Sequence, residues 1–127
     1  MPSPIVALLQ DPDRRALTEL VSESVRFHSP VADYEGRRDV AHLLLLIGNV
    51  LEDLRPTREL RTSTTHTTFL EAIVSGRPIQ GVFDEHHDAS GRVLEATLML
   101  RPLGVLHTAV QAMAEALDSE PLPSRGY

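Results

Sequence analysis

The segment FDEHHD, residues 83–88, contains five consecutive side chains that could bind a metal ion or transfer a proton. They are Asp84, Glu85, His86, His87 and Asp88. Carboxylates and imidazoles act as metal ligands and as general acids or bases, and histidine changes its charge near neutral pH. Neighbouring residues of a β-strand point to opposite faces of the sheet, so the available chemistry depends on which of the five share a face. The elements around the segment must therefore be assigned first.

Composition excludes several classes of function. The chain has 127 residues, of which 42% are hydrophobic, and this is enough to bury one core without disulfides. Lysine and cysteine are absent, which excludes Schiff-base chemistry, thiol nucleophiles and thiolate metal sites. The net charge of -6 disfavours binding to nucleic acid, and no apolar run is long enough to span a bilayer. We expect one cytoplasmic domain that binds neither nucleic acid nor membranes.

The spacing of apolar residues predicts helices at both ends of the domain, with a central helix and a meander of strands between them. Ser3 and Asp11, each followed by proline, are typical N-caps of two short opening helices. A strand pattern begins at Val25, and a helical stripe runs over residues 38–54. Further strands are predicted at roughly 57–64, 65–75, 78–88 and 92–101, and a last helix follows Pro102. We expect a single domain over 1–118 and a disordered tail over 119–127.

Helices, then a meander of antiparallel strands, then a closing helix indicate an α+β fold with helices on one face of a curved sheet. Three short segments, FHSPV at 27–31, YEG at 34–36 and RPL at 101–103, resemble the SnoaL-like branch of the nuclear transport factor 2-like superfamily. The resemblance extends from Leu17 to Leu117. It implies a cone-shaped α+β fold, shared with ketosteroid isomerase and polyketide cyclases, in which a curved antiparallel sheet wraps around helices.

The resemblance also implies a pocket between helices and sheet, a C-terminal helix and usually a homodimer. Its members include isomerases, cyclases, hydratases and non-catalytic binders. No catalytic motif of the family matches this sequence residue by residue, so the resemblance leaves the reaction open.

The last two hairpins decide which residues of segment 83–88 share a face. If Gly76–Arg77 and Ala89–Ser90 form two-residue turns, one face of these strands is almost wholly apolar. On that face Glu85 and His87 lie with His66, while Asp84 and His86 lie on the opposite face. The predicted rows of the apolar face are Val74–Ile79–Leu100, Ala72–Gly81–Leu98, Leu70–Phe83–Ala96, Thr68–Glu85–Leu94 and His66–His87–Arg92.

The group formed by Glu85, His66 and His87 allows three interpretations. Two histidines and a carboxylate resemble the ligand set of a metal site, but no further carboxylates support them, so we expect no metal and no cofactor. A glutamate or histidine at the rim of an apolar cone is also suited to general acid–base catalysis. The simplest interpretation is a strand that becomes polar as it reaches its turn. Glu85 and His66 are our candidate catalytic residues.

The opposite face mixes apolar and charged side chains, among them Val82 and Met99. Asp84 and Glu95 are predicted directly across the ladder, where two like charges repel unless a cation lies between them. A mixed face of this extent needs a cover, either a second chain or the terminal helices. We therefore expect a homodimer formed through this face of the sheet.

The pocket of the cone is expected to hold a small apolar molecule, with Tyr34, Phe83 and His87 as candidate binding residues. Because the apolar rows lead towards Glu85 and the histidines, we predict that the pocket opens at the histidine end. One hypothesis is a binding or assembly module without catalysis. The alternative is a cofactor-free isomerase, cyclase or hydratase with a His or Glu at the pocket rim. The two differ in whether an ionisable group faces an open cavity, so whether the protein is an enzyme stays open at this point.

Overall fold

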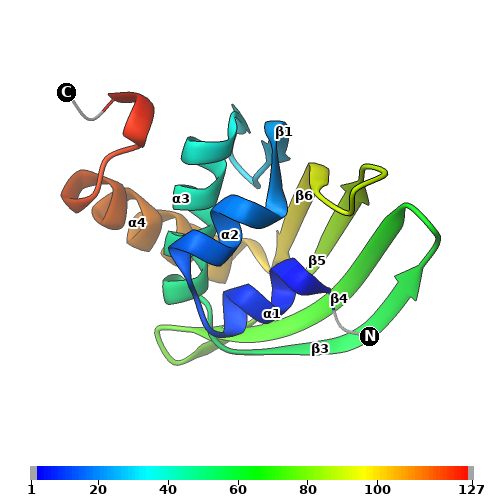
Figure 1. Ribbon diagram of the computed structural model, residues 1–127. Coiled ribbons are helices and arrows are strands. Elements are labelled where there is room, and N and C mark those ends of the chain that lie inside the picture. The colour runs from blue at the N-terminus through cyan, green and yellow to red at the C-terminus, as the bar shows by residue number, and fades with distance from the viewer. Residues whose placement is uncertain (1–2, 126–127) are drawn as a thin grey trace.

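The computed structural model describes residues 3–125, which form four α-helices and one six-stranded sheet (Figure 1). Within these residues no helix has both the length and the hydropathy that crossing a membrane requires. The elements are α1 (Pro4–Gln10), α2 (Arg14–Leu20), β1 (Val21–His28), β2 (Asp33–Glu35), α3 (Arg37–Val50), β3 (Glu52–Arg61), β4 (Thr65–Val74), β5 (Arg77–His87), β6 (Val93–Arg101) and α4 (Leu103–Ser119), with a final 3-10 turn, η1 (Pro123–Arg125).

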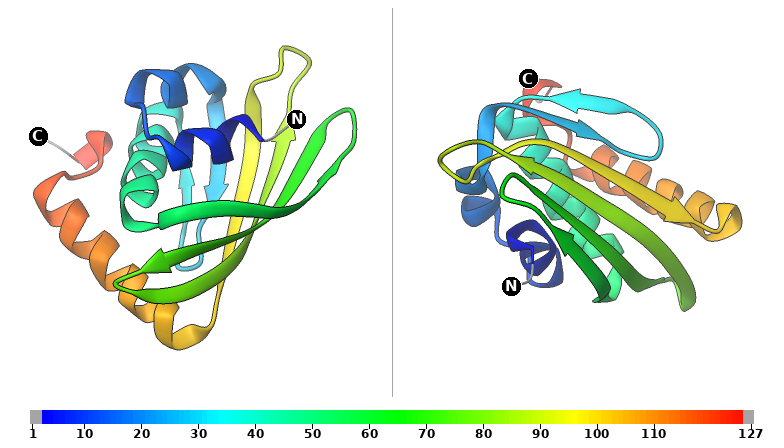
Figure 2. Two further views of the ribbon diagram at one scale, coloured as in Figure 1. Left: turned by 90° about the horizontal axis from the view of Figure 1, so that it is seen from below. Right: turned by 90° about the vertical axis from the view of Figure 1, so that its right-hand side faces the viewer.

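The sheet has the strand order β2-β1-β6-β5-β4-β3 and curves around the helices (Figure 2). This confirms the predicted α+β fold with its curved sheet and C-terminal helix. The sheet is mixed rather than wholly antiparallel, because β1 pairs in parallel with β6. After β1 the chain passes through β2 and α3 to the far edge of the sheet. Strands β1 and β6 are therefore joined by a long connection rather than by a hairpin, which allows them to run parallel.

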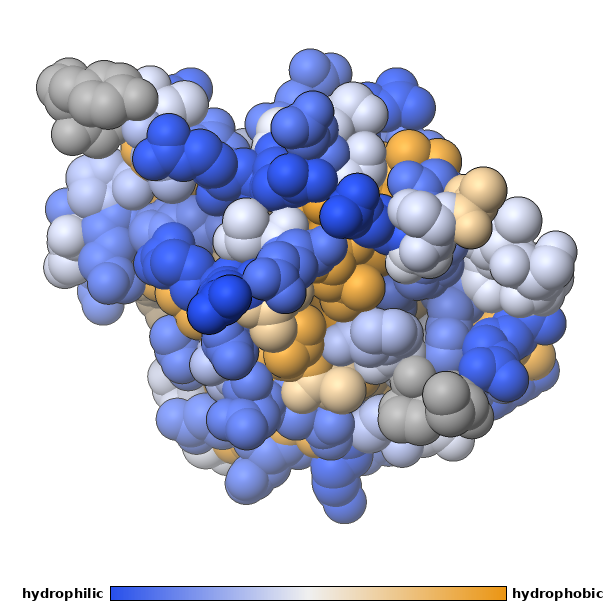
Figure 3. All heavy atoms as spheres, viewed as in Figure 1, coloured by the Kyte–Doolittle hydropathy of each residue, from blue (hydrophilic) through white to orange (hydrophobic). Residues whose placement is uncertain are grey.

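Helices α1, α2 and α3 cover one face of the sheet, and α4 runs beside α3 (Figure 2). A glycine allows α1 to pack closely on α3. A Cβ on Gly48 would lie 2.7 Å from Pro12 Cγ and 3.0 Å from the carbonyl oxygen of Leu9. This close approach holds the C-terminal end of α1 against α3. On the face that carries α1 and α2, hydrophilic side chains predominate, with a strip of hydrophobic atoms near the centre (Figure 3).

The central helix ends earlier than the predicted residue 54. Helix α3 ends at Val50, and β3 begins at Glu52. Leu51 and Leu54 are still buried, at 4% and 5% exposed. Both leucines are apolar and fall at the helical spacing, so the sequence pattern did not show that the helix ends before Leu54, which lies in a strand. Asp53 adopts a φ of 50°, a conformation that aspartate tolerates better than most residues, and it lies where the chain turns.

The predicted faces of β4–β6 are correct except at the start of β6, but the predicted pairings are displaced by two residues. The β4–β5 turn is Ser75–Gly76, in which both residues have positive φ, so Val74 pairs with Arg77. The β5–β6 loop spans residues 88–92, with Gly91 at a φ of 87°. A displacement of two residues keeps each side chain on its face. It changes the cross-strand partners, so His66 lies opposite Glu85 rather than His87.

One prediction about the faces is wrong. Leu94 was expected in the core, but it is 40% exposed, and Val93 is fully buried instead. A β-bulge at His86/His87 causes the exchange, because one extra residue on one strand reverses the alternation beyond it.

The segment after α4 packs against α3 as far as Arg125. The buried ring of His42 donates through Nε2 to the carbonyl oxygen of Glu120 (2.6 Å), while Nδ1 accepts from Arg14 Nη1 (3.0 Å). Ser124 donates from its amide and its hydroxyl to Asp39. Leu122 is buried as well. Residues 119–125, which the sequence suggested as part of a disordered tail, thus make these contacts with the domain, while residues 126–127 lie outside the described part of the chain.

Candidate functional site

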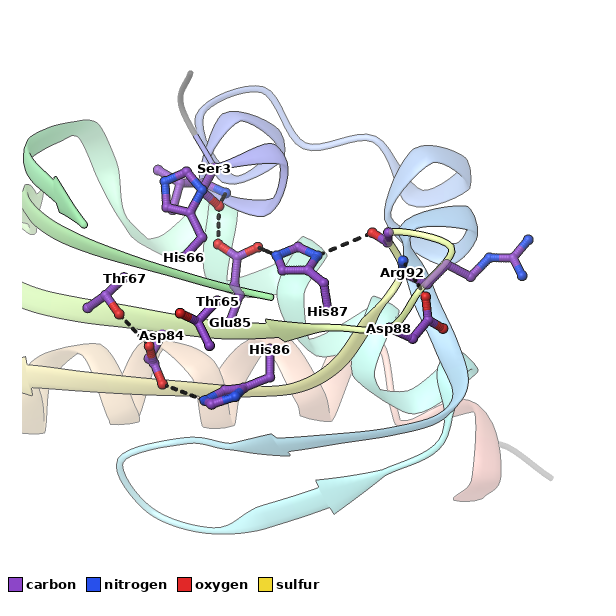
Figure 4. A network of polar contacts seen from close by, with 12 residues as sticks. Ser3, Thr65, His66, Thr67, Asp84, Glu85, His86, His87, Asp88 and Arg92 are labelled. Atoms are coloured by element: carbon purple, nitrogen blue, oxygen red, sulfur yellow. Dashed lines mark hydrogen bonds and ion pairs between the residues drawn. The ribbon is translucent and has the colours of Figure 1, made fainter. Parts of the chain in front are cut away.

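The polar segment at the end of β5 divides between the two faces as predicted (Figure 4). Glu85 lies on the helix-covered face and is 0% exposed, while the Asp84 and His86 side chains on the other face remain partly accessible. Asp88 begins the loop and uses one carboxylate oxygen to accept from the Ser90 amide (2.8 Å) and the Arg92 amide (3.0 Å). These bonds, with the Ser90 hydroxyl bond as the largest contribution, lower the pKa of Asp88. Asp88 is therefore a loop-forming residue.

Glu85 is the most unusual group of the segment because it is an acid inside the core. The hydroxyl of Ser3, at the N-terminus of α1, donates to Glu85 Oε2. The other oxygen, Oε1, is buried without a hydrogen-bond partner among the described residues and lies 3.5 Å from His87 Nε2. Burial raises the pKa of Glu85 to about 7, which outweighs the opposing effect of the Ser3 hydroxyl; the charges of Asp84 and Glu59 raise it further. Near neutral pH this carboxyl group can hold or release a proton.

His66 belongs to the same buried cluster. Its ring is opposite Glu85 in the β4–β5 ladder, and Nε2 lies 2.7 Å from Glu59 Oε1. The amide of Ser3 donates to that same Glu59 oxygen over 3.2 Å. The Ser3 hydroxyl also accepts from the amide of Val6, so one N-cap residue connects α1 to both carboxylates. We call Ser3, Glu59, His66, Glu85 and His87 the buried polar cluster.

The cluster has the chemistry of an acid–base site but lies under α1. His66 is 4% exposed and Glu85 is fully buried, while the side chains of Glu59, 30% accessible, and His87, 16% accessible, reach towards solvent. Among residues 3–125, no three His, Asp or Glu side chains are grouped so that they could hold a metal ion. The interpretation of His66, Glu85 and His87 as metal ligands therefore has no support in the geometry.

On the opposite face the predicted pair of like charges does not exist. Asp84 lies opposite Thr97 and accepts from the Thr67 hydroxyl (2.5 Å), and Glu95 lies opposite His86. Glu95 also contacts His28, whose Nε2 is 2.6 Å from its carboxylate. The two-residue displacement of the hairpin explains the correction, because it moves Glu95 away from Asp84.

His28 connects three strands of this face. Its second ring nitrogen, Nδ1, lies 2.8 Å from Asp33 on β2. The hydrogen bonds to Glu95 and Asp33 raise the pKa of His28, and the His28 bond lowers the pKa of Glu95. An imidazolium held between two carboxylates ties β2, β1 and β6 together, which makes His28 a structural residue.

An apolar cavity of about 180 Å³ lies between α3, α4, the β1–β2 hairpin and β6. The predicted mouth at the histidine end is wrong, because α1 closes that end and the space remains at the α4 side. The exposed residues of its wall are on the hairpin turn and on α4, including Val31, which is 63% exposed. Its wall consists of Phe27, Ser29, Pro30, Val31, Tyr34, Leu43, Ile47, Val50, Leu51, Leu98, Leu100, Leu106, Ala109, Val110, Met113, Ala114 and Leu117.

The predicted site residues thus fall into separate places. Tyr34 lines the cavity, whereas Glu85, His66 and His87 belong to the buried polar cluster and do not contribute to the cavity wall. Phe83 lies behind the wall in the core, stacked on Phe27 with 6.3 Å between ring centroids.

The sequence did not indicate which residues of α4 line the cavity, or that Ser3 belongs to the buried polar cluster. The α4 stripe, which includes Leu106, Val110 and Met113, was predicted from its spacing, but nothing in that spacing distinguishes a cavity wall from a packed helix. Ser3 was correctly expected to be an N-cap, and its second role at Glu85 has no local sequence signal.

Comparisons with known proteins identify the fold. No protein-family model and no curated protein matches the chain. It is similar to an uncharacterised protein with a cystatin-like fold from Silicibacter pomeroyi, with TM-score 0.87 and 20% identity over 92% of this chain and 84% of that one. A steroid delta-isomerase from Pseudomonas aeruginosa has TM-score 0.83 and 26% identity over 89% of this chain and 85% of that one.

An NTF2-like protein of unknown function from Cytophaga hutchinsonii has TM-score 0.68 and 12% identity over 81% of this chain and 88% of that one. These similarities cover between 81% and 92% of this chain. The chain therefore has the same cone-shaped fold as these NTF2-like and cystatin-like proteins.

Proposed function

We propose that the protein binds a small apolar molecule in the cavity between α3, α4, the β1–β2 hairpin and β6, without acting on it chemically. The observation that carries this proposal is the composition of the cavity wall. Of its 17 residues, Ser29 and Tyr34 are the only ones with polar side chains, and no carboxylate, histidine or arginine is among them. A wall of this kind favours apolar ligands, and it offers no group that exchanges a proton near neutral pH.

The proposal predicts that filling the cavity abolishes binding. Butylbenzene, a neutral apolar probe, is expected to raise the melting temperature of the wild type by about 3 to 6 °C at ten times its Kd. In Val110→Trp the probe should cause no shift, because Val110 lies on the cavity wall and the indole ring would occupy the space. Thermal unfolding with and without the probe is the measurement.

The matched control is Gln111→Trp. Gln111 is the exposed neighbour of Val110 on α4 and is not part of the wall, so the probe should still stabilise this variant. If butylbenzene does not stabilise the wild type, or stabilises both tryptophan variants equally, the cavity is not its binding site and the proposal fails.

The alternative is a cofactor-free isomerase, cyclase or hydratase that uses Glu85 or His66 as acid or base. Two observations favour it: the pKa of Glu85, which burial raises to about 7, and the similarity to a steroid delta-isomerase. Against it, the buried polar cluster is closed by α1 and is separate from the cavity wall. Conversion of a 5-ene-3-ketosteroid to its conjugated isomer, lost in Glu85→Gln, would establish the alternative.

We also propose a homodimer through the outer face of the sheet, the face away from the helices. The terminal helices leave this face uncovered, since Met99 remains 55% exposed, and Phe69 and Val82 lie beside it on the wall of the same shallow groove. A second copy would remove these apolar side chains from water.

Sedimentation of the wild type is expected to show a dimer at micromolar concentration, and Met99→Glu should sediment as a monomer. The introduced carboxylate would be buried without a partner in the interface, which is strongly unfavourable. Leu103→Glu is the control, because Leu103 is 66% exposed on α4 and lies outside this face. A monomeric wild type, or a Met99→Glu dimer as stable as the control, contradicts the proposal.

A further inference from the structure

The hydrogen-bonding groups on the cavity wall define what kind of ligand fits. Ser29 is already fully engaged in the β1–β2 turn. Its hydroxyl donates to the carbonyl oxygen of Ala32 (2.9 Å) and accepts from the amides of Ala32 (3.1 Å) and Val31 (3.3 Å). The Tyr34 hydroxyl, in contrast, makes no hydrogen bond to any other described residue, so it is the one polar side-chain group on this wall that is available to a ligand.

The size of the cavity limits the ligand further. An apolar protein cavity of about 150 Å³ holds one benzene molecule. The cavity here, at about 180 Å³, therefore accommodates one ring with a short substituent. It is too small to enclose a molecule of four fused rings.

The absence of charge on the wall excludes ionised ligands. No arginine, histidine or carboxylate among the described residues lines the cavity, so a bound carboxylate or ammonium group would have no counter-charge. Burying an unpaired charge is far more costly than burying a neutral polar group that finds one hydrogen-bond partner.

We infer that the ligand is a neutral one-ring molecule with a single hydroxyl or carbonyl group, and that Tyr34 determines specificity by forming a hydrogen bond to that group. This inference rests on the proposed function, because it describes the occupant of the same cavity. Tyr34 is well placed for the role. It lies on β2 opposite Phe27 and lines the hairpin side of the cavity.

Three probes of nearly equal shape test the inference: butylbenzene, 3-phenylpropan-1-ol and 3-phenylpropanoate. Calorimetric titration of the wild type is expected to give the alcohol an affinity about 3- to 10-fold higher than that of butylbenzene. The reason is that butylbenzene would cover the Tyr34 hydroxyl without replacing its hydrogen bond to water. The carboxylate should bind at least about 100-fold more weakly than the alcohol.

Tyr34→Phe should remove the preference for the alcohol while leaving the affinity for butylbenzene unchanged or higher. The comparison is between the alcohol-to-butylbenzene affinity ratio of the wild type and the same ratio of Tyr34→Phe. This comparison depends on the hydrogen bond between the two hydroxyl groups, because general damage to the fold would weaken the binding of both probes together. A four-ring steroid ketone serves as the size control and should bind more weakly than the alcohol.

The outcomes separate the inference from the proposed function. If butylbenzene binds but the wild type does not prefer the alcohol, or Tyr34→Phe keeps the preference, the inference is overturned and the cavity remains a binding site. This first comparison needs only wild-type protein. Equal or tighter binding of the steroid overturns the one-ring limit. If no probe binds and Val110→Trp behaves like the wild type, the proposed function itself fails.

Discussion

Replacing Phe83 by alanine is expected to lower the free energy of unfolding by about 3 to 5 kcal/mol. The ring is fully buried and lies nearly parallel to that of Phe27, at an interplanar angle of 24°. Its removal leaves a void that the surrounding strands can close only in part, and it also removes the contact between the two aromatic rings.

Urea denaturation of the wild type and the variant measures this loss. Leu103→Ala is the control, because a leucine that is 66% exposed should change stability by no more than about 0.5 kcal/mol. The experiment also distinguishes two roles for Phe83. The sequence suggested a ligand contact, and an accessible ring of that kind would cost less than about 1 kcal/mol on truncation. A loss that small would contradict the buried position.

The strand faces were predictable because side chains alternate with a period of two. Leu70, Phe83 and Glu85 were assigned to the core side correctly even though both turns were misplaced, since a displacement of two residues preserves the face. Partners across the ladder were not predictable to the same degree. They depend on which residues take positive φ, and a serine at φ 49° in the β4–β5 turn is an uncommon choice.

The candidate site was predictable only in part, for a different physical reason. Period and register brought Glu85 and His66 together on one face, and the structure places them side by side. Ser3 completes the cluster from 82 residues away in the chain, and the docking of α1 on α3 determines its position. The cavity likewise depends on how α4 lies against α3, which apolar spacing alone does not define.

The largest pH-dependent effect is expected from Glu85→Gln. Burial raises the pKa of Glu85 from 4.5 to about 7, so the folded protein binds this proton more tightly than the unfolded chain does. The resulting stability is fully present below the unfolded pKa of 4.5 and is lost as the pH rises through about 7. An amide of similar shape has no charge to desolvate. The variant should therefore be more stable than the wild type by about 3 kcal/mol at pH 8 and nearly equal to it at pH 4.

Chemical denaturation of both proteins at pH 4, 6 and 8 tests this, and the difference between them removes the contribution of other titrating groups such as His28. Glu95→Gln is the matched control with the opposite sign. The hydrogen bond from His28 lowers the pKa of Glu95, so this carboxylate stabilises the fold above its unfolded pKa and the control should gain nothing at pH 8. Parallel pH profiles for wild type and Glu85→Gln would contradict the raised pKa of Glu85 and would mean that a charged His87 pairs with the carboxylate or that water solvates it. A raised pKa would instead make the stabilities of the two proteins diverge between pH 4 and pH 8. Below the folded pKa of about 7 the carboxyl group of Glu85 is neutral, and Ser3 then holds α1 against this neutral group.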